Sequence, residues 1–134
     1  KVNFLKLLSA RLKIYEKIKI IHGRAEDLAD EKKYREQFDI VLARAVAPLK
    51  ILAEYTVPFA EKEGLLLYYK GPDYRKEIEK SETAFKKLGA SRQKIQEIKV
   101  PGLDAKRYIL YYKKTDYTPE KYPRRAGIPK KRPL

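Results

Sequence analysis

The hydrophobic and polar positions of the chain alternate with two different periods. Over residues 1–18, apolar side chains recur every three or four positions with Lys and Arg on the other side, which predicts an amphipathic helix. The same period predicts helices over residues 48–60 and 73–89. Pro48 suits the first turn of the former helix, and Gly89 suits the end of the latter. The polar stretch over residues 24–37 predicts a loop and a short solvated helix.

Short apolar runs rich in β-branched and aromatic residues predict five strands. They are IKIIHG (18–23), FDIVLARAV (38–46), LLLYYKG (65–71), KIQEIKV (94–100) and KRYILYYKK (106–114). The middle of FDIVLARAV is apolar on both faces, which is typical of a sheet covered by helices on each side. The loop PGLDA joins the last two strands, so we expect them to form an antiparallel hairpin.

The order of these elements predicts an α/β fold. Strands that alternate with helices imply parallel pairing, and the final hairpin adds an antiparallel strand. We expect one domain over residues 1–116, followed by an extended basic tail of the same domain over residues 117–134. Prolines at positions 123, 129 and 133 should keep that tail extended.

Charge narrows the possible partners. The chain has 32 Lys and Arg against 18 Asp and Glu, a net charge of +14. Such an excess favours a polyanionic partner, because phosphate contacts dominate nucleic-acid affinity, although a merely solubilising surface is the alternative. Without Cys and with His22 as its one histidine, the sequence argues against thiolate zinc sites, His-rich metal sites and a His-based triad, so we expect no metal. No apolar run reaches membrane-span length, and no signal peptide opens the chain.

Three short motifs follow or end predicted strands, where ligands bind in open α/β sheets. They are HGRAED, ARAV and YKGPD. Together with the C-terminal sequence YPRRAGIPKKRPL, they make the chain resemble the bacterial 16S ribosomal RNA guanine-N7 methyltransferase family, also called glucose-inhibited division protein B. The resemblance covers essentially the whole chain.

This resemblance implies a class I S-adenosylmethionine-dependent methyltransferase fold, which is Rossmann-like, and methyl transfer to N7 of a guanine in 16S ribosomal RNA. It implies that Ala25 and Glu26 lie beside the adenine of S-adenosylmethionine and that Arg44 belongs to the cofactor site. The partner would be 16S ribosomal RNA or the small ribosomal subunit, in the cytoplasm. Guanine N7 carries no proton, so no general base is needed, and the sequence indicates no catalytic residue.

The RNA-binding residues are inferred from charge. We expect contacts to RNA from Lys70 and from five cations of the tail: Arg124, Arg125, Lys130, Lys131 and Arg132. For Lys70 a purely structural position at a strand end is an equal alternative. The tyrosines of the strands are expected to pack in the core more often than to stack on bases.

The sequence departs from the family in one respect. The Gly-rich cofactor loop after the family's first strand and the acidic residue after its second are not in this chain. We therefore expect a C-terminal part of the enzyme, inactive by itself, in which the first two strands of the 3-2-1-4-5-7-6 sheet are absent. The strands over residues 18–23 and 38–46 should then be separated by about 14 Å and unpaired; the alternative is that the chain closes this gap by rearrangement or strand swapping. The alternative function is a non-catalytic RNA-binding module.

Overall fold

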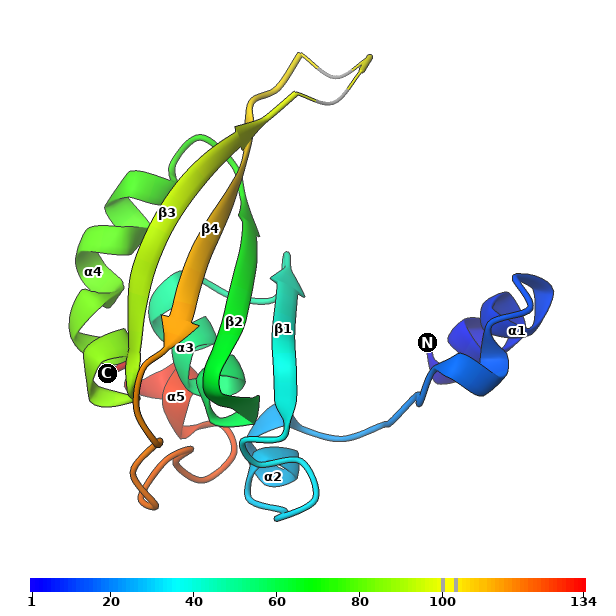
Figure 1. Ribbon diagram of the computed structural model, residues 1–134, viewed down its shortest axis with the longest axis horizontal. Helices are drawn as coiled ribbons and strands as arrows, with labels where there is room; N and C mark the ends of the chain where they lie inside the picture. The colour runs from blue at the N-terminus through cyan, green and yellow to red at the C-terminus, as the bar shows by residue number, and fades with distance from the viewer. Residues whose placement is uncertain (100, 103) are drawn as a thin grey trace.

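The structure, a computed structural model, describes residues 1–99, 101–102 and 104–134 (Figure 1). Its helices and strands, with two 3₁₀ turns η1 and η2, are α1 Val2–Arg11, η1 Tyr15–Lys17, α2 Ala25–Ala29, β1 Phe38–Arg44, α3 Leu49–Thr56, η2 Val57–Phe59, β2 Ala60–Lys70, α4 Tyr74–Lys87, β3 Ala90–Ile98, β4 Arg107–Lys114 and α5 Ile128–Lys131. The last residue of the strand predicted over 94–100, and one residue of the loop predicted over 101–105, lie outside the described residues.

Four strands form a single mixed sheet in the order β1-β2-β4-β3. β1 and β2 are parallel and are connected through α3, whereas β4 is antiparallel to both β2 and β3. This order confirms the prediction that the four later strands are arranged 4-5-7-6, and it confirms the C-terminal hairpin. Strands β3 and β4 extend beyond the end of β1 (Figure 1).

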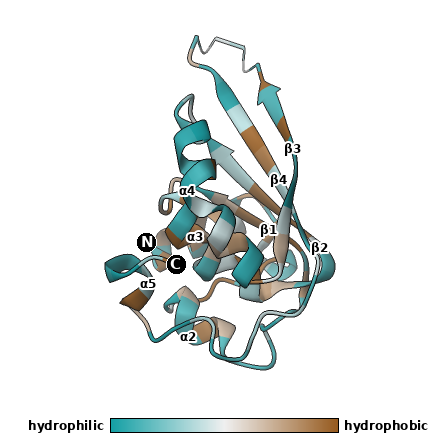
Figure 2. Cartoon of the chain, turned by 90° about the vertical axis from the view of Figure 1, so that its left-hand side faces the viewer, coloured by the Kyte–Doolittle hydropathy of each residue, from teal (hydrophilic) through white to brown (hydrophobic). Residues whose placement is uncertain are grey.

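The core lies between the sheet and the helices α3 and α4, which cover the same face of the sheet (Figures 1 and 2). Side chains of β2 alternate across the sheet, so Tyr68 is fully buried while its neighbour Tyr69 is exposed. Tyr68, Phe85 of α4 and Tyr112 of β4 form an aromatic cluster at the centre, with the rings of Phe85 and Tyr112 stacked at a centroid separation of 3.9 Å. This cluster joins the helix layer to the middle of the sheet.

Gly89 ends α4, as the sequence predicts. Its φ of +82° is in the left-handed region that glycine tolerates best. A Cβ at this position would lie 2.5 Å from the carbonyl oxygen of Asp116, and the carbonyl of Gly89 accepts a hydrogen bond of 2.8 Å from the backbone N–H of Thr115. Glycine is therefore required both by the backbone angle and by the close approach of the chain that leaves β4.

The prediction of a strand over residues 18–23 is wrong. Ile18 has extended backbone angles, but residues 18–23 form no ladder with any strand of the described chain. An extended segment becomes a strand only when a neighbour satisfies its N–H and C=O groups, and none lies beside it here. The related expectation that this segment does not pair with β1 is confirmed.

The sheet is covered on one face only, which corrects the expectation of helices on both sides. Ile40 and Leu42 of β1, whose apolar character suggested double coverage, have 54% and 59% of their surface exposed. They point away from α3 and α4, and β1 is also the edge strand of the sheet. An apolar strand is buried on both faces only if a second layer is present, and no described element forms that layer.

Helix α1 has the predicted amphipathic sequence but lies apart from the sheet (Figure 1). Its apolar side chains are in contact with solvent, and Phe4 is 65% exposed. Among the described residues, no helix is long and apolar enough to span a membrane. The apolar periodicity therefore predicted the helix correctly, but no described element packs against its apolar side.

The contrast between α1 and the core gives a stability prediction. Replacing Phe85 by Ala removes the ring that stacks on Tyr112 and should lower the free energy of unfolding by about 3–5 kcal/mol. Replacing Phe4 by Ala, a change of the same chemistry at an exposed position, should lower it by less than about 0.5 kcal/mol. Urea unfolding followed by circular dichroism measures both values. Equal losses for the two variants would show that α1 packs on the domain in solution.

Candidate active site at the carboxyl ends of the strands

The ends of all four strands enclose a pocket of about 520 Å³, here called the strand-end pocket. Because β1 and β2 are parallel, their carboxyl ends meet at one edge of the sheet, where Arg44 lies opposite Tyr69. The antiparallel strands add the end of β3 and the start of β4 at the same edge. The residues that line the pocket are Arg44, Ala45, Tyr69, Lys70, Gly71, Ile98, Arg107 and Tyr108.

The strand-end pocket is cationic. Three of its lining residues carry positive charge and none carries negative charge. Lys70 is largely neutralised, because its Nζ donates to Oε2 of Glu77 at 2.7 Å and to the carbonyl oxygen of Ala47 at 3.1 Å. Arg107 donates only to the carbonyl oxygen of its neighbour Lys106, and Arg44 makes no side-chain hydrogen bond or ion pair with another described residue. The two arginines are therefore available to an anionic ligand.

Lys70 has a structural role in this chain. The carboxylate of Glu77 that it binds also accepts a hydrogen bond of 2.7 Å from the backbone N–H of Leu49, the first residue of α3. Lys70 thus connects the end of β2 with the start of α3 and with α4. Of the two roles open for Lys70 at the sequence level, these contacts favour the structural one.

The backbone turns sharply directly after Arg44. Ala45 has a φ of +55°, in the left-handed region that costs a non-glycine residue about 1–3 kcal/mol. The turn ends β1 and starts the chain toward α3, and Ala45 itself lines the strand-end pocket. Backbone strain of this kind is concentrated at functional sites, which agrees with the importance that the sequence analysis gives to the ARAV motif.

The structure does not bring Ala25 and Glu26 next to Arg44. α2, which contains both residues, lies beside the end of β1 where the strand begins, whereas Arg44 is at the other end (Figure 1). The Glu26 side chain is buried, and its Oε1 accepts a hydrogen bond of 3.0 Å from the backbone N–H of Gly127. The adenine role of these residues stays a prediction, and within this chain Glu26 binds the C-terminal segment, residues 115–134.

The C-terminal segment is folded against the domain and is not an extended tail. Arg124 forms a bidentate pair with Glu54 of α3, with Nε–Oε1 and Nη2–Oε2 distances of 2.9 and 2.7 Å, and its backbone N–H donates to the same carboxylate. These hydrogen bonds raise the pKa of Arg124. Glu54 is 1% exposed, so Arg124 is the partner that allows a buried carboxylate. The local preference of proline for extended structure is overridden by this pairing.

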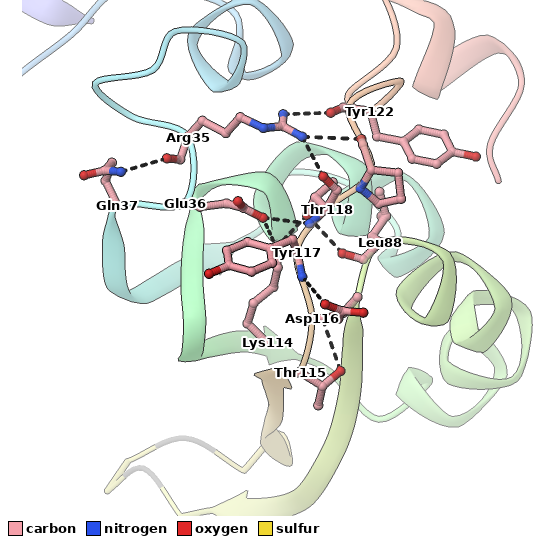
Figure 3. A network of polar contacts seen from close by, with 12 residues as sticks. Arg35, Glu36, Gln37, Leu88, Lys114, Thr115, Asp116, Tyr117, Thr118 and Tyr122 are labelled. Carbon is pink, nitrogen blue, oxygen red and sulfur yellow. Dashed lines mark hydrogen bonds and ion pairs between the residues drawn. The ribbon is translucent and has the colours of Figure 1, made fainter.

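A second polar network fixes the start of the C-terminal segment (Figure 3). The Arg35 guanidinium donates to the carbonyl oxygens of Thr118 and Tyr122 at 2.9 and 2.8 Å. The neighbouring Glu36 accepts hydrogen bonds from Nζ of Lys114 at 2.8 Å and from the backbone N–H of Thr118 at 2.7 Å. The loop before β1 is thereby joined to the chain that leaves β4.

Of the five cations of this segment that were predicted to bind RNA, four remain exposed: Arg125, Lys130, Lys131 and Arg132. The end of the chain, including α5, carries them on the outside, while Pro129 is buried beneath. His22 is exposed and lies beside the first residues of α1, and no group of three or more His, Cys, Asp or Glu side chains among the described residues could hold a metal ion.

Sequence reasoning missed several residues that the fold makes important. Tyr69, near the end of β2, and Arg107, at the start of β4, line the strand-end pocket; Tyr69 begins the YKGPD motif but was expected to pack in the core, and Arg107 belongs to no motif. The partly buried Glu36 and the buried Glu54 were also missed. A glutamate in the apolar stretch ILAEYTV signals a buried partner, but the sequence does not identify that partner as Arg124.

A mixed α/β sheet with a pocket at the carboxyl ends of its parallel strands is consistent with a Rossmann-like methyltransferase fold. A solved structure described as "a putative methyltransferase from Thermoplasma acidophilum" has this fold, with a TM-score of 0.52 and 16% sequence identity over 82% of this chain and 53% of that one. The chain belongs to the GidB family, because the model of that family, described as rRNA small subunit methyltransferase G, matches residues 1–109.

Curated relatives agree with the family. Proteins called ribosomal RNA small subunit methyltransferase G from Thermoanaerobacter pseudethanolicus, Lactobacillus helveticus and Brevibacillus brevis are 46%, 40% and 38% identical to this chain over all 134 residues. The match covers 100% of this chain but only 55–56% of each relative, so the chain spans about half the length of the relatives that it matches.

The buried pair of Lys114 and Glu36 gives a second prediction. Replacing Glu36 by Gln leaves the fully buried ammonium of Lys114 without a counter-charge and should cost about 3–5 kcal/mol of unfolding free energy at neutral pH. Replacing Lys114 by Met should cost less, because Glu36 keeps the N–H of Thr118 and is partly solvated.

The pH dependence distinguishes these two variants. Burial lowers the pKa of Lys114 below its usual 10.5, so the folded Glu36→Gln protein releases the lysine proton at a pH where the unfolded chain still binds it. Its stability should therefore rise as the pH increases from the lowered pKa toward about 10.5. Urea unfolding at neutral pH and near pH 10 measures this gain. An equal gain in Lys114→Met would show that another group is responsible.

Proposed function

We propose that the protein of which this chain is a part transfers a methyl group from S-adenosylmethionine to N7 of a guanine in 16S ribosomal RNA. The observation that carries the proposal is the match of the whole chain to proteins called ribosomal RNA small subunit methyltransferase G, at 38–46% identity. The strand-end pocket supports it, because an open α/β sheet binds its ligands at this edge. The expected place of action is the cytoplasm, where ribosomal subunits are found.

The residues of the strand-end pocket fit part of the cofactor. The unpaired guanidinium of Arg44 suits a carboxylate, which S-adenosylmethionine carries at its methionine end. When bound, the cofactor supplies the methyl group and a neutral leaving group. Because N7 of guanine has a free lone pair and no proton, the protein has to align the nucleophile with the methyl group but does not have to remove a proton.

The proposed adenine ligands, Ala25 and Glu26, are not at this pocket in the chain described here. Their role, taken from the family resemblance, requires α2 to lie nearer the carboxyl end of β1 than it does here. The Glu26 carboxylate would then exchange the backbone N–H of Gly127 for another partner. The cofactor site within this chain is accordingly incomplete, and we expect weak binding of S-adenosylmethionine to the chain alone.

A non-catalytic RNA-binding module is the second candidate function. It is favoured by the separation of α2 from the strand-end pocket and by the exposed cations of the C-terminal segment. The two candidates differ in their ligands. Calorimetric titration with S-adenosylmethionine, performed on this chain and on a protein extended upstream to the length of its relatives, distinguishes them, because the module would bind RNA without binding the cofactor.

The cofactor role of Arg44 can be tested by substitution. In the extended protein, Arg44→Ala should weaken S-adenosylmethionine binding about ten-fold or more, because a charged hydrogen bond contributes about 1.5–3 kcal/mol. Arg92→Ala is the matched control, since Arg92 lies on β3 outside the strand-end pocket.

Calorimetry gives both affinities, and transfer of a labelled methyl group to small-subunit RNA, followed by identification of 7-methylguanosine, tests the reaction. Equal cofactor affinities for the Arg44 and Arg92 variants would exclude Arg44 from the cofactor site. The absence of 7-methylguanosine would contradict the proposed reaction.

The exposed cations of the C-terminal segment are proposed to bind the RNA backbone. Replacing Arg125, Lys130, Lys131 and Arg132 by Gln should lower RNA affinity and reduce the slope of log K against log salt by about 0.7–0.9 for each phosphate that is no longer bound. Cofactor affinity and the unfolding free energy should change little, because these side chains are exposed. Arg124 is left intact, since its removal would strand the buried Glu54. Filter binding between about 50 and 300 mM salt measures the slope, and an unchanged slope would mean that the segment only solubilises the protein.

A further inference from the structure

The strand-end pocket has a second half that the cofactor role of Arg44 does not use. Arg44 is on β1 and Arg107 is on β4, with β2 between them, and Arg107 is two residues along its strand from the position level with Arg44, so their backbones are about 12 Å apart. Tyr69 of β2 lies opposite Arg44 in the pairing with β1 and opposite Ile109 in the pairing with β4. Because side chains alternate along a strand, Arg44, Tyr69 and Arg107 all point to the sheet face that α3 and α4 leave uncovered.

Tyr69 differs from the other tyrosines near it. Tyr69 is 41% exposed and lines the pocket, whereas Tyr68 and Tyr112 are buried in the core. Tyr108, which also lines the pocket, is held against Tyr74 with a ring-centroid separation of 4.4 Å, so it forms a fixed wall. An exposed aromatic ring at a cationic pocket is the arrangement that stacks on a nucleic-acid base, and such stacking contributes about 1–3 kcal/mol per base.

The charge of the pocket determines which part of a nucleotide each group can take. Arginine commonly binds guanine through O6 and N7 together, but that contact would occupy the lone pair that has to accept the methyl group. Arg107 is therefore better suited to a phosphate, which it can bind with two parallel hydrogen bonds. No acid lines the pocket to oppose a phosphate there.

We propose that Tyr69 stacks on the target guanine and that Arg107 binds the phosphate of the same nucleotide, which places N7 beside the part of the pocket that holds the methyl donor. This inference rests on the proposed function. It makes both residues positioning groups for the RNA and reverses the sequence-level expectation that the strand tyrosines serve packing. It also divides the pocket between Arg44 for the cofactor and the Tyr69–Arg107 pair for the substrate.

Steady-state kinetics of methyl transfer by the extended protein tests the proposal. Tyr69→Ala should raise KM for the RNA about ten-fold or more and leave KM for S-adenosylmethionine nearly unchanged, while Tyr69→Phe, which keeps the ring, should restore the wild-type value. Arg107→Gln should raise KM for the RNA and reduce its salt slope by about 0.7–0.9. Tyr117→Ala and Arg92→Gln are the controls, because both residues are exposed and neither lines the pocket.

A higher KM for S-adenosylmethionine in Tyr69→Ala, with an unchanged KM for the RNA, would overturn the proposal, since the ring would then contact the cofactor. Unchanged constants for both substrates would overturn it as well. In each case wild-type 7-methylguanosine formation would still support the proposed function.

A direct titration distinguishes failure of the pocket assignment from failure of the proposed function. Guanosine 5′-monophosphate is titrated into the wild-type chain and into Tyr69→Ala and Arg107→Gln, with ribose 5-phosphate as the probe that lacks a base. Saturable binding of the guanine nucleotide that both substitutions weaken supports the pocket assignment even if no methyl transfer is detected. Binding that neither substitution changes, or no saturable binding by the wild-type chain, overturns it.

Discussion

The β1–α3–β2 crossover pairs two parallel strands, and its register sets Arg44 beside Tyr69. Burial of α3 on the sheet and the carboxylate of Glu77, which accepts from Leu49 and Lys70, hold the crossover together. A slip of β1 by one residue would turn Arg44 toward the helix-covered face, where an unpaired guanidinium could not be accommodated. The strand-end pocket and its positive charge, and with them the proposed division of roles, depend on this register.

Two ion pairs give the C-terminal segment its place. Lys114 binds Glu36, and Arg124 binds Glu54, in each case across a long stretch of sequence. A buried pair contributes modest net stability, but the loss of one partner is costly because the other charge remains buried. The pairs therefore specify where the segment lies more than they stabilise the fold. They also divide the basic residues into those that hold the segment and those that are left exposed at its surface.

The amphipathic helix α1 and the uncovered face of the sheet share one physical property. Each has an apolar side, and the apolar side of a helix or a sheet is normally buried against another element. Within the described chain these two surfaces do not meet, so Phe4 on α1 and Leu42 on β1 are exposed to solvent. The local sequence pattern is therefore satisfied in secondary structure but not in packing, and periodicity alone could not reveal the difference.

The sequence by itself determined the helices α1, α3 and α4, the strands β1 to β4 and the position of Arg44 at a strand end, because hydrophobic period, proline and glycine act over a few neighbouring residues. It also identified the family through short motifs, and the order of the strands was predicted from that resemblance. Only the tertiary structure decided that residues 18–23 form no strand and that one sheet face is uncovered, since both depend on a partner surface. Tertiary structure also decided that Arg124 pairs with Glu54 and Lys70 with Glu77. It likewise brought Tyr69 and Arg107 to the same pocket. Pairing between residues far apart in sequence leaves no local signal, because it is fixed by the strand register and by the requirement that every buried charge has a counter-charge.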